Sequence, residues 1–369
     1  MFEIEKTYQA DEINAYPSLG DPGKVLFFDI ETTGLSAFGS SLYLIGVTYF
    51  RDGIWHLHQW FSASLSDEIP VLQAFSSFLE DFDTVVHYNG DTFDIPYLRS
   101  LYEQYHLNAP FERLSSVDLL KAARRIRPLL HPASLRQKDV ETALGIQRED
   151  TKSGAELIAV YAKWQACPDD ELLHDLLLHN EDDVKGLVPI LKILALDDLF
   201  QGRLKANDIQ TEYRKEDLLL LTASYPLNFP INGPLASQTG VFATLSGNTV
   251  ELRIPLFHGE LKRFLPNPKA YYYLPREDMI IPRELGSGVD LNHRVPAKKD
   301  TCYVRLTDDF IPALPSLSTE VFRRAFIDKE SMMRLKDLRP EEYLHAFLSN
   351  VLTEKPVHAI EKETGDRTR

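Results

Sequence analysis

An apolar run in this chain leads directly into two acidic residues: Val25-Leu26-Phe27-Phe28-Asp29-Ile30-Glu31-Thr32-Thr33-Gly34-Leu35. The first four residues are rich in strand formers and predict a buried strand. Side chains two apart on a strand share a face, so Asp29 and Glu31 should point the same way where the strand ends. Two carboxylates held close together repel each other unless a cation lies between them. The pair is therefore either part of a metal site or a charged strand end in solvent.

A second acid follows another strand-like run, Thr84 to Tyr88, which ends at the turn pair Asn89-Gly90. A helical pattern begins at Ile95, and Asp94 lies near the start of that helix. An acid in the first turn can simply stabilise the helix dipole. It can also face the same site as the first two acids.

A third acidic group, His179-Asn180-Glu181-Asp182-Asp183-Val184, lies in a long helical pattern. His179 and Asp183 are four apart and share one helix face, so Asp183 can complete a metal site while His179 takes a proton from water. The alternative is an ordinary surface pair. Asp182 competes with Asp183 as a ligand, but it lies about 100° around the helix. Oxygen ligands suit Mg²⁺ or Mn²⁺, and two such ions would stabilise the attacking and leaving oxygens of a phosphodiester hydrolysis.

Together the three segments resemble the motifs of the DEDD superfamily of 3′–5′ exonucleases, which have an RNase H-like fold. Residues 28–35 match the first motif, and residues 88–98 match the second in the form found in proofreading domains of family-B polymerases. His179 and Asp183 have the spacing of the third motif in the Tyr-type branch, which carries Tyr where this chain has His. The resemblance extends over roughly residues 22–200 and is greatest to the YprB-like group of bacterial RNase H-like proteins, which Ser134-Leu135, Leu144-Gly145-Ile146 and Ser153-Gly154 also fit.

The resemblance implies a role for each acid and for the loop that follows the first strand. Because this chain has His where the Tyr-type branch has Tyr, His179 would serve either as the base that accepts the proton of the attacking water or as the group that orients this water. The implied ligands of two Mg²⁺ or Mn²⁺ ions are Asp29, Glu31, Asp94 and Asp183. The implied contacts to the terminal nucleotide are Thr32, Thr33 and Leu35, with Leu35 packed against the base. Asn89 would help to hold either the active-site loop or the substrate. Asp118 is either a residue behind this site or a helix-start residue.

The net charge and the composition limit the classes of function and the cellular location that we expect. The net charge of −15 counts against a protein that coats nucleic acid non-specifically, since such binding needs a positive field. A basic cluster at residues 121–138 is either a set of phosphate contacts or a solvated helix face. The candidate phosphate contacts in it are Arg124, Arg125 and Arg136. The chain has no long apolar run that predicts a membrane span and no evident signal peptide. With only two distant cysteines, a cytoplasmic location is expected.

The chain is expected to hold more than one domain at 369 residues. We predict a polar leader over 1–21, an α/β domain over 22–200 in which an RNase H-like mixed sheet is flanked by helices, and a smaller β-rich module over 205–310. A helical region over 311–360 and a disordered tail over 361–369 complete the prediction. Within the α/β domain, strands are expected at 25–29, 41–50 and 54–61, with a hairpin turn at Asp52-Gly53 and a helix over 67–82.

These features predict a two-metal 3′–5′ exonuclease that acts on a single-stranded 3′ end of DNA or RNA. Two alternatives remain open from the sequence. One is a nucleic-acid-binding or scaffold protein that has the fold without the chemistry, which the unusual third motif and the acidic charge allow. The other is a hydrolase of short oligonucleotides, because an acidic surface suits a short substrate better than a long one.

Overall fold

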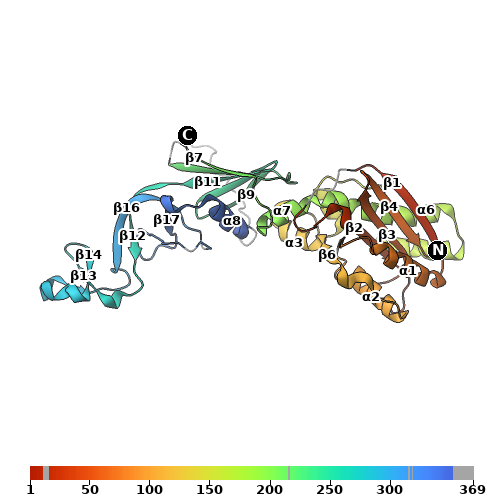
Figure 1. Ribbon diagram of the computed structural model, residues 1–369, viewed down its shortest axis with the longest axis horizontal. Helices are drawn as coiled ribbons and strands as arrows, with labels where there is room; N and C mark the ends of the chain where they lie inside the picture. Colours follow the sequence, from red (N-terminus) through yellow and green to blue (C-terminus); the bar gives the residue numbers. More distant parts are fainter. Residues whose placement is uncertain (11–15, 215–216, 315, 318, 352–369) are drawn as a thin grey trace, which may run out of the picture. The chain divides into compact units, whose positions relative to one another are not determined.

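Two units make up the chain in the computed structural model, which describes residues 1–10, 16–214, 217–314, 316–317 and 319–351 (Figure 1). The first unit comprises Met1–Leu204 together with Leu227–Ile231. The second comprises Lys205–Pro226 and the described residues from Asn232 onward.

A six-stranded mixed sheet forms the centre of the first unit. Its strand order is β1-β4-β3-β2-β5-β6. The first four strands in this order pair antiparallel, whereas β2, β5 and β6 run parallel. This sheet confirms the predicted fold class. The strands are β1 Phe2–Tyr8, β2 Val25–Thr32, β3 Leu42–Arg51, β4 Ile54–Phe61, β5 Thr84–His87 and β6 Ser115–Asp118.

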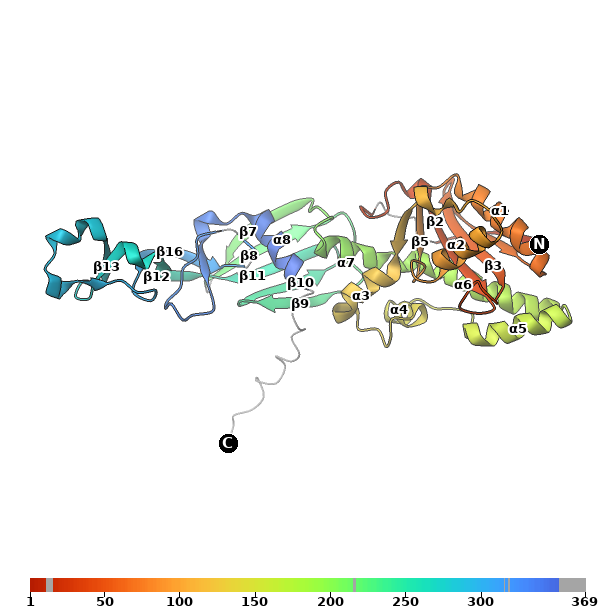
Figure 2. The same ribbon diagram turned by 90° about the horizontal axis from the view of Figure 1, so that it is seen from below.

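Helices cover both faces of this sheet (Figures 1 and 2). On one face, Phe28 of β2 packs on Phe75 and Phe111 in a core that also includes apolar residues of α1 and α2. On the other face, Tyr43 of β3 stacks on Tyr161 of α5, beside residues of α6. Burial from both sides explains why the first four residues of β2, Val25 to Phe28, are all apolar. The helices are α1 Glu68–Leu79, α2 Asp94–Gln104, α3 Leu119–Leu130, α4 Gln137–Ala143, α5 Gly154–Ala166, α6 Asp170–Ile190 and α7 Lys192–Phe200.

The hairpin turn between β3 and β4 and the edge strand β1 bear on two of the predictions from the sequence. Asp52 and Gly53 both have positive φ, 55° and 79°, and form the predicted hairpin turn between β3 and β4. The leader prediction is wrong for its first part, because Phe2–Tyr8 forms the edge strand β1. Pairing with β4 along its whole length, together with the ring contact of Phe2 with Phe61, holds this polar segment in place.

The second unit is β-rich. Its largest sheet is antiparallel, in the order β7-β8-β11-β10-β9, and two three-stranded sheets follow, β12-β16-β17 and β14-β13-β15. The strands are β7 Asp208–Arg214, β8 Leu218–Ser224, β9 Gly233–Gln238, β10 Val241–Ser246, β11 Thr249–Pro255, β12 Phe257–Phe264, β13 Tyr271–Leu274, β14 Met279–Pro282, β15 Val295–Pro296, β16 Tyr303–Pro312 and β17 Met332–Arg334.

Within the described residues of the predicted helical region 311–360, the α-helix is α8, Pro340–Val351. Ahead of it, Met332–Arg334 forms the strand β17, which pairs with β16. Met333 is buried in that sheet and not on the apolar face of a helix. The predicted tail, 361–369, lies outside the described residues. Within the described part of the chain, no helix is both long enough and apolar enough to cross a membrane.

Candidate active site

Asp29 and Glu31 lie near the carboxyl end of β2, the central strand of the sheet. Asp29 Oδ2 accepts a hydrogen bond from Asn180 Nδ2 of α6, at 3.1 Å. Glu31 Oε2 accepts one from the Tyr43 hydroxyl, at 3.3 Å, but Glu31 Oε1 is buried and has no hydrogen-bond partner. The backbone N–H of Ile30, between the two acids, donates to Asp94 Oδ1 at 3.2 Å. The acids of the first two sequence segments therefore meet at one strand end.

Mutual repulsion and burial perturb these carboxyl groups. Burial raises the pKa of Asp29 well above its ordinary range, and the charges of Asp183, Asp94 and Glu31 raise it further. Burial and the charge of Asp183 likewise raise the pKa of Glu31. Burial raises the pKa of Asp94 to about 6, even though backbone hydrogen bonds favour its ionised form. Four acids from three distant segments thus act on one another electrostatically.

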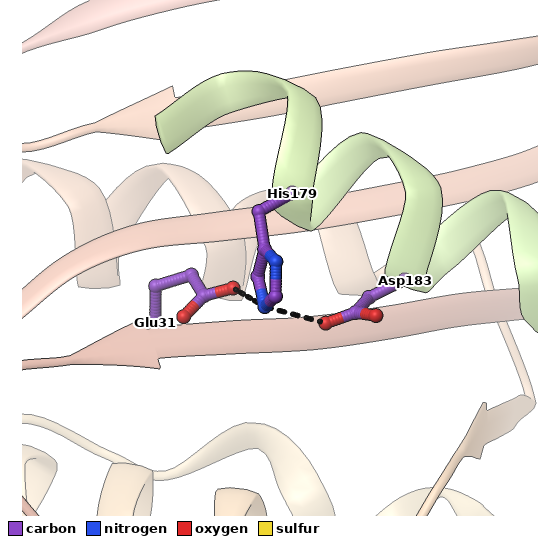
Figure 3. Close-up of side chains that lie close together, drawn as sticks. All are labelled: Glu31, His179 and Asp183. Atoms are coloured by element: carbon purple, nitrogen blue, oxygen red, sulfur yellow. Dashed lines mark ion pairs between the residues drawn. The ribbon is translucent and has the colours of Figure 1, made fainter. Parts of the chain in front are cut away.

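His179 and Asp183 face these acids from α6, as their spacing predicted. His179 is buried, and its Nε2 lies 3.7 Å from Glu31 Oε1 and 3.3 Å from Asp183 Oδ2 (Figure 3). Its other ring nitrogen, Nδ1, lies 2.7 Å from Asp150 Oδ2. Asp150 also accepts hydrogen bonds from Lys138 Nζ and from the backbone N–H of Lys152. The imidazole is therefore oriented by a carboxylate on its far side.

A loop between α4 and α5 completes this side of the site. Arg148 of the loop binds Asp183 Oδ1 and forms two hydrogen bonds to the fully buried Glu141 of α4. Asp182 is not turned toward the acids, because its Oδ2 accepts the backbone N–H groups of Glu149 and Asp150, at 2.8 and 2.7 Å. The two acids therefore differ in their contacts: Asp182 anchors the loop backbone, whereas Asp183 lies beside His179 and Glu31.

Asn180 links the same helix to the sheet. Its Oδ1 accepts a hydrogen bond from Gln59 Nε2 of β4, and its Nδ2 donates to Asp29. The side chain fits only because β3 has a glycine here, since a Cβ on Gly46 would lie 1.8 Å from Asn180 Oδ1. This close approach sets the position of α6 against the strand that carries the acids.

The loop after β2 presents apolar side chains beside the site. Thr32 Oγ1 donates to the Gly34 carbonyl, and Thr33 Oγ1 accepts from the backbone N–H of Ser41, so both hydroxyls hold the loop itself. Leu35 and Phe38 of this loop are 89% and 94% exposed. Two large apolar side chains this exposed on one loop make it a candidate contact surface for a partner.

Asn89 lies in the turn after β5, and Asp118 is the last residue of the neighbouring strand β6. Asn89 has φ of 68°, and its Oδ1 accepts a hydrogen bond from Thr92. Asp118 is the N-cap of α3 and accepts the backbone N–H groups of Leu120 and Asn89. The helix-start interpretation of Asp118 is confirmed, and its second hydrogen bond holds the turn that precedes Asp94.

Two residues of the basic cluster form ion pairs with buried acids of this unit. Arg125 forms a two-pronged ion pair with the buried Asp197 of α7, and so helps hold α3 against α7. Lys138 is paired with Asp150. Arg124 and Arg136 are exposed, on α3 and at the start of α4.

The donors present suit a divalent cation. The carboxylates repel one another, and one of them, Glu31, has a buried oxygen without a hydrogen-bond donor. An imidazole nitrogen is directed at them. A bound divalent ion would satisfy all of these groups. Sequence reasoning missed Asp150, Arg148 and Asn180 as parts of this arrangement. Asn180 was within reach, since it adjoins His179 in the third motif, but Arg148 and Asp150 lie in an irregular loop with no periodic signal.

Comparison with known proteins agrees with the fold of the first unit. Residues 26–195 match the model of the RNase_H superfamily, which, with the mixed sheet, identifies this region as an RNase H-like domain. The chain is also similar to the uncharacterized protein YprB of Bacillus subtilis (strain 168), with 29% identity over 169 residues, and this bears out the predicted resemblance. The aligned part spans 45% of this chain and 40% of that relative.

Among solved structures, the family B DNA polymerase from the archaeon Pyrobaculum calidifontis aligns with 89% of this chain and 45% of its own length. The identity is 13% and the TM-score 0.41. A similarity of that size does not define a fold, so the fold assignment rests on the strand order and the superfamily match.

Proposed function

We propose that this protein is a metal-dependent 3′–5′ exonuclease of the DEDD type, acting on a single-stranded 3′ end of nucleic acid. The observation that carries the proposal is the convergence of Asp29, Glu31, Asp94 and Asp183, in which the charges of the other three raise the pKa of Asp29. Repelling acids gathered at the end of a central strand have a clear use when divalent cations lie between them.

In this proposal the four acids hold two Mg²⁺ or Mn²⁺ ions. When bound, the ions supply activation of the attacking water and stabilisation of the leaving 3′-oxygen. Asp150 holds the His179 ring through Nδ1, so the lone pair of Nε2 is available at the acid cluster. That lone pair can either accept the proton of the attacking water or bind an ion directly.

Substrate contacts come from the loop after β2 and from the basic surface. Leu35, and beside it Phe38, offer exposed apolar surface on which a terminal base can pack. Thr32 and Thr33 keep the loop in shape, and Asn89 holds the turn before Asp94. Arg124 and Arg136 are exposed and can contact backbone phosphates, whereas Arg125 would first have to leave Asp197.

The test is a Mn²⁺-dependent cleavage time course on single-stranded DNA and RNA labelled at the 5′ or the 3′ end. The 5′-labelled strand should shorten progressively from its 3′ end, and Asp29→Asn should slow cleavage at least about 10³-fold, since metal ions supply several kcal/mol of stabilisation. Cleavage of a dinucleotide but not of a long strand would point to an oligonucleotide hydrolase. No cleavage of either by folded protein would leave the binding or scaffold role.

A further inference from the structure

We propose that His179 is itself a metal ligand. Its Nε2 atom, Glu31 Oε1 and Asp183 Oδ2 form a mixed nitrogen–oxygen site for a divalent transition-metal ion, and Asp150 is the residue that positions the imidazole. The proposal rests on the proposed function, because it uses part of the same acid cluster, and it assigns the Nε2 lone pair to the ion rather than to the proton of water.

The hydrogen bonding of His179 sets the direction of its lone pair. Nδ1 lies 2.7 Å from Asp150 Oδ2, and Asp150 also receives Lys138 Nζ at 2.9 Å and the Lys152 N–H at 2.9 Å. A carboxylate held by these donors is an acceptor, so the proton of the imidazole belongs on Nδ1. Histidine ligands of metal ions commonly donate their other N–H to a carboxylate in this way.

With the imidazole proton on Nδ1, the three ligand atoms that face one another are Nε2, Asp183 Oδ2 and Glu31 Oε1. Nε2 lies 3.3 Å from Asp183 Oδ2 and 3.7 Å from Glu31 Oε1, and the three atoms all lie within 4.8 Å of one another (Figure 3). Glu31 is only 9% exposed, and its Oε1 is buried without a hydrogen-bond partner. A buried oxygen in that state is costly, and an ion shared by the three atoms would remove the cost.

The distances distinguish an ion from a water molecule. Ligand atoms about 2.1 Å from one ion lie roughly 3.0–3.4 Å apart, close to the separation of Nε2 from Asp183 Oδ2. A water bridging two acceptors would separate them by roughly 4.5 Å. The space between His179 and Asp183 therefore fits direct coordination better than a bridging water.

A second group of possible ligands in the described residues shows the contrast. His87, Asp91 and Asp118 also have ligand atoms within 4.8 Å of one another. There, however, His87 Nδ1 accepts from the Gly90 N–H and Nε2 pairs with Ser116. Asp91 is bonded by Ser116 and Lys121, and Asp118 caps α3. Internal donors satisfy that cluster, so it does not call for a cation.

The donor set predicts which ions bind. Imidazole nitrogen favours later transition metals over Mg²⁺, and affinity for a nitrogen–oxygen site rises from Mn²⁺ to Co²⁺. We therefore expect Co²⁺ to bind more tightly than Mn²⁺, and Mn²⁺ more tightly than Mg²⁺. His179→Gln should reduce Co²⁺ affinity by at least tenfold while changing Mg²⁺ affinity little. Asp150→Asn should reduce Co²⁺ affinity about 10–100-fold, the usual effect of losing such an orienting partner.

Pulsed EPR of the full chain, free of any histidine tag and loaded with Mn²⁺, is the direct test. Wild-type protein should show the ¹⁴N coupling of a coordinated imidazole, and His179→Gln should lose it while it still binds Mn²⁺. His174→Gln is the matched control, because His174 is an exposed histidine of the same helix. Circular dichroism verifies that the variants fold. The ¹⁴N coupling of the wild-type protein is a test that does not depend on the folding of any variant.

The outcomes separate this inference from the proposed function. Bound Mn²⁺ without ¹⁴N coupling, or coupling that persists in His179→Gln, would overturn the assignment of His179 as a ligand. Cleavage of nucleic acid together with an absent ¹⁴N coupling would leave the exonuclease standing and return His179 to the role of proton acceptor. A ¹⁴N coupling in a protein that cleaves nothing would support the ligand and refute the exonuclease.

Discussion

Asp94 accepts a hydrogen bond from the backbone N–H of Ile30, the residue between Asp29 and Glu31. The first turn of α2 is thereby tied to the end of β2 by the very side chain that we expect to hold a metal ion. The position of this acid does not depend on a flexible side chain reaching across a cleft. It is set by main-chain geometry, and the carboxylate keeps its second oxygen for other contacts.

The raised pKa of Asp94 predicts how stability depends on pH in metal-free protein. A carboxyl whose pKa is raised by folding adds stability that is fully present below the unfolded value and is lost as pH rises through the folded value. For Asp94 the change from 3.8 to about 6 corresponds to about 3 kcal/mol, since each pKa unit is worth about 1.4 kcal/mol. In EDTA, the free energy of unfolding of Asp94→Asn minus that of wild type should therefore rise by up to this amount between pH 4 and pH 7. Urea unfolding at several pH values measures it, and a flat difference would contradict the prediction.

Removing Arg148 should leave two carboxylates, those of Glu141 and Asp183, without the positive charge that pairs with them. Arg148→Met leaves Glu141 buried without its guanidinium partner, and we expect a loss of about 3–5 kcal/mol in metal-free protein. Mn²⁺ should stabilise this variant more than it stabilises wild type, because the ion then supplies the positive charge beside Asp183. Thermal unfolding with and without Mn²⁺ gives both quantities. The double variant Arg148→Met/Glu141→Leu is the control, and it should recover most of the stability.

Gly46→Ala should disturb the site from within the sheet. The added Cβ would lie 1.8 Å from Asn180 Oδ1, so Asn180 must move and its hydrogen bond to Asp29 must change. We expect a loss of about 1–3 kcal/mol from overpacking and weaker Mn²⁺ binding by calorimetry. Gly154→Ala, with nothing within 4 Å of the new atom, should change neither. Adding Asn180→Ala to Gly46→Ala should restore stability but not the affinity for Mn²⁺; recovery of both would argue that Asn180 has no part in the site.

The exposed loop should affect substrate binding alone. Replacing both Leu35 and Phe38 by alanine should raise KM for a single-stranded substrate about tenfold or more, given a stacking contribution of about 1–3 kcal/mol per base. The melting temperature and Mn²⁺ affinity should stay unchanged, because both side chains are almost fully exposed. Leu291→Ala, at an exposed leucine of the second unit, serves as the control. An unchanged KM in the double variant would remove the loop from the proposed substrate contacts.

Periodic patterns carried most of what could be predicted for the first unit. The apolar run before Asp29 and the turn at Asp52-Gly53 predicted strands and a hairpin because both signals are local. The edge strand Phe2–Tyr8 was missed although Phe2, Ile4 and Tyr8 recur at period two, because that alternation is short and the strand is ordered by pairing with β4. The same reason applies to Met332–Arg334, which is ordered by pairing with β16.

The candidate site divides along similar lines. Asp29, Glu31, Asp94 and Asp183 were predictable because each lies at a fixed offset in a regular element. Asp150 and Arg148 were not, since an irregular loop brings them to α6 through backbone hydrogen bonds to Asp182. Local spacing can place residues on one element, whereas contacts between a loop and a helix depend on the whole fold.

The turn of α6 from His179 to Asp183 has a further consequence for how this protein can evolve. Four of its side chains have partners on other elements: His179 binds Asp150, Asn180 binds the sheet, Asp182 binds the loop backbone and Asp183 binds Arg148. A single inserted or deleted residue would rotate one side of the turn by about 100° relative to the other and break several of these contacts at once. Lineages can therefore replace individual side chains here, but a change of length in this turn would have to be matched by simultaneous changes in the sheet and the loop.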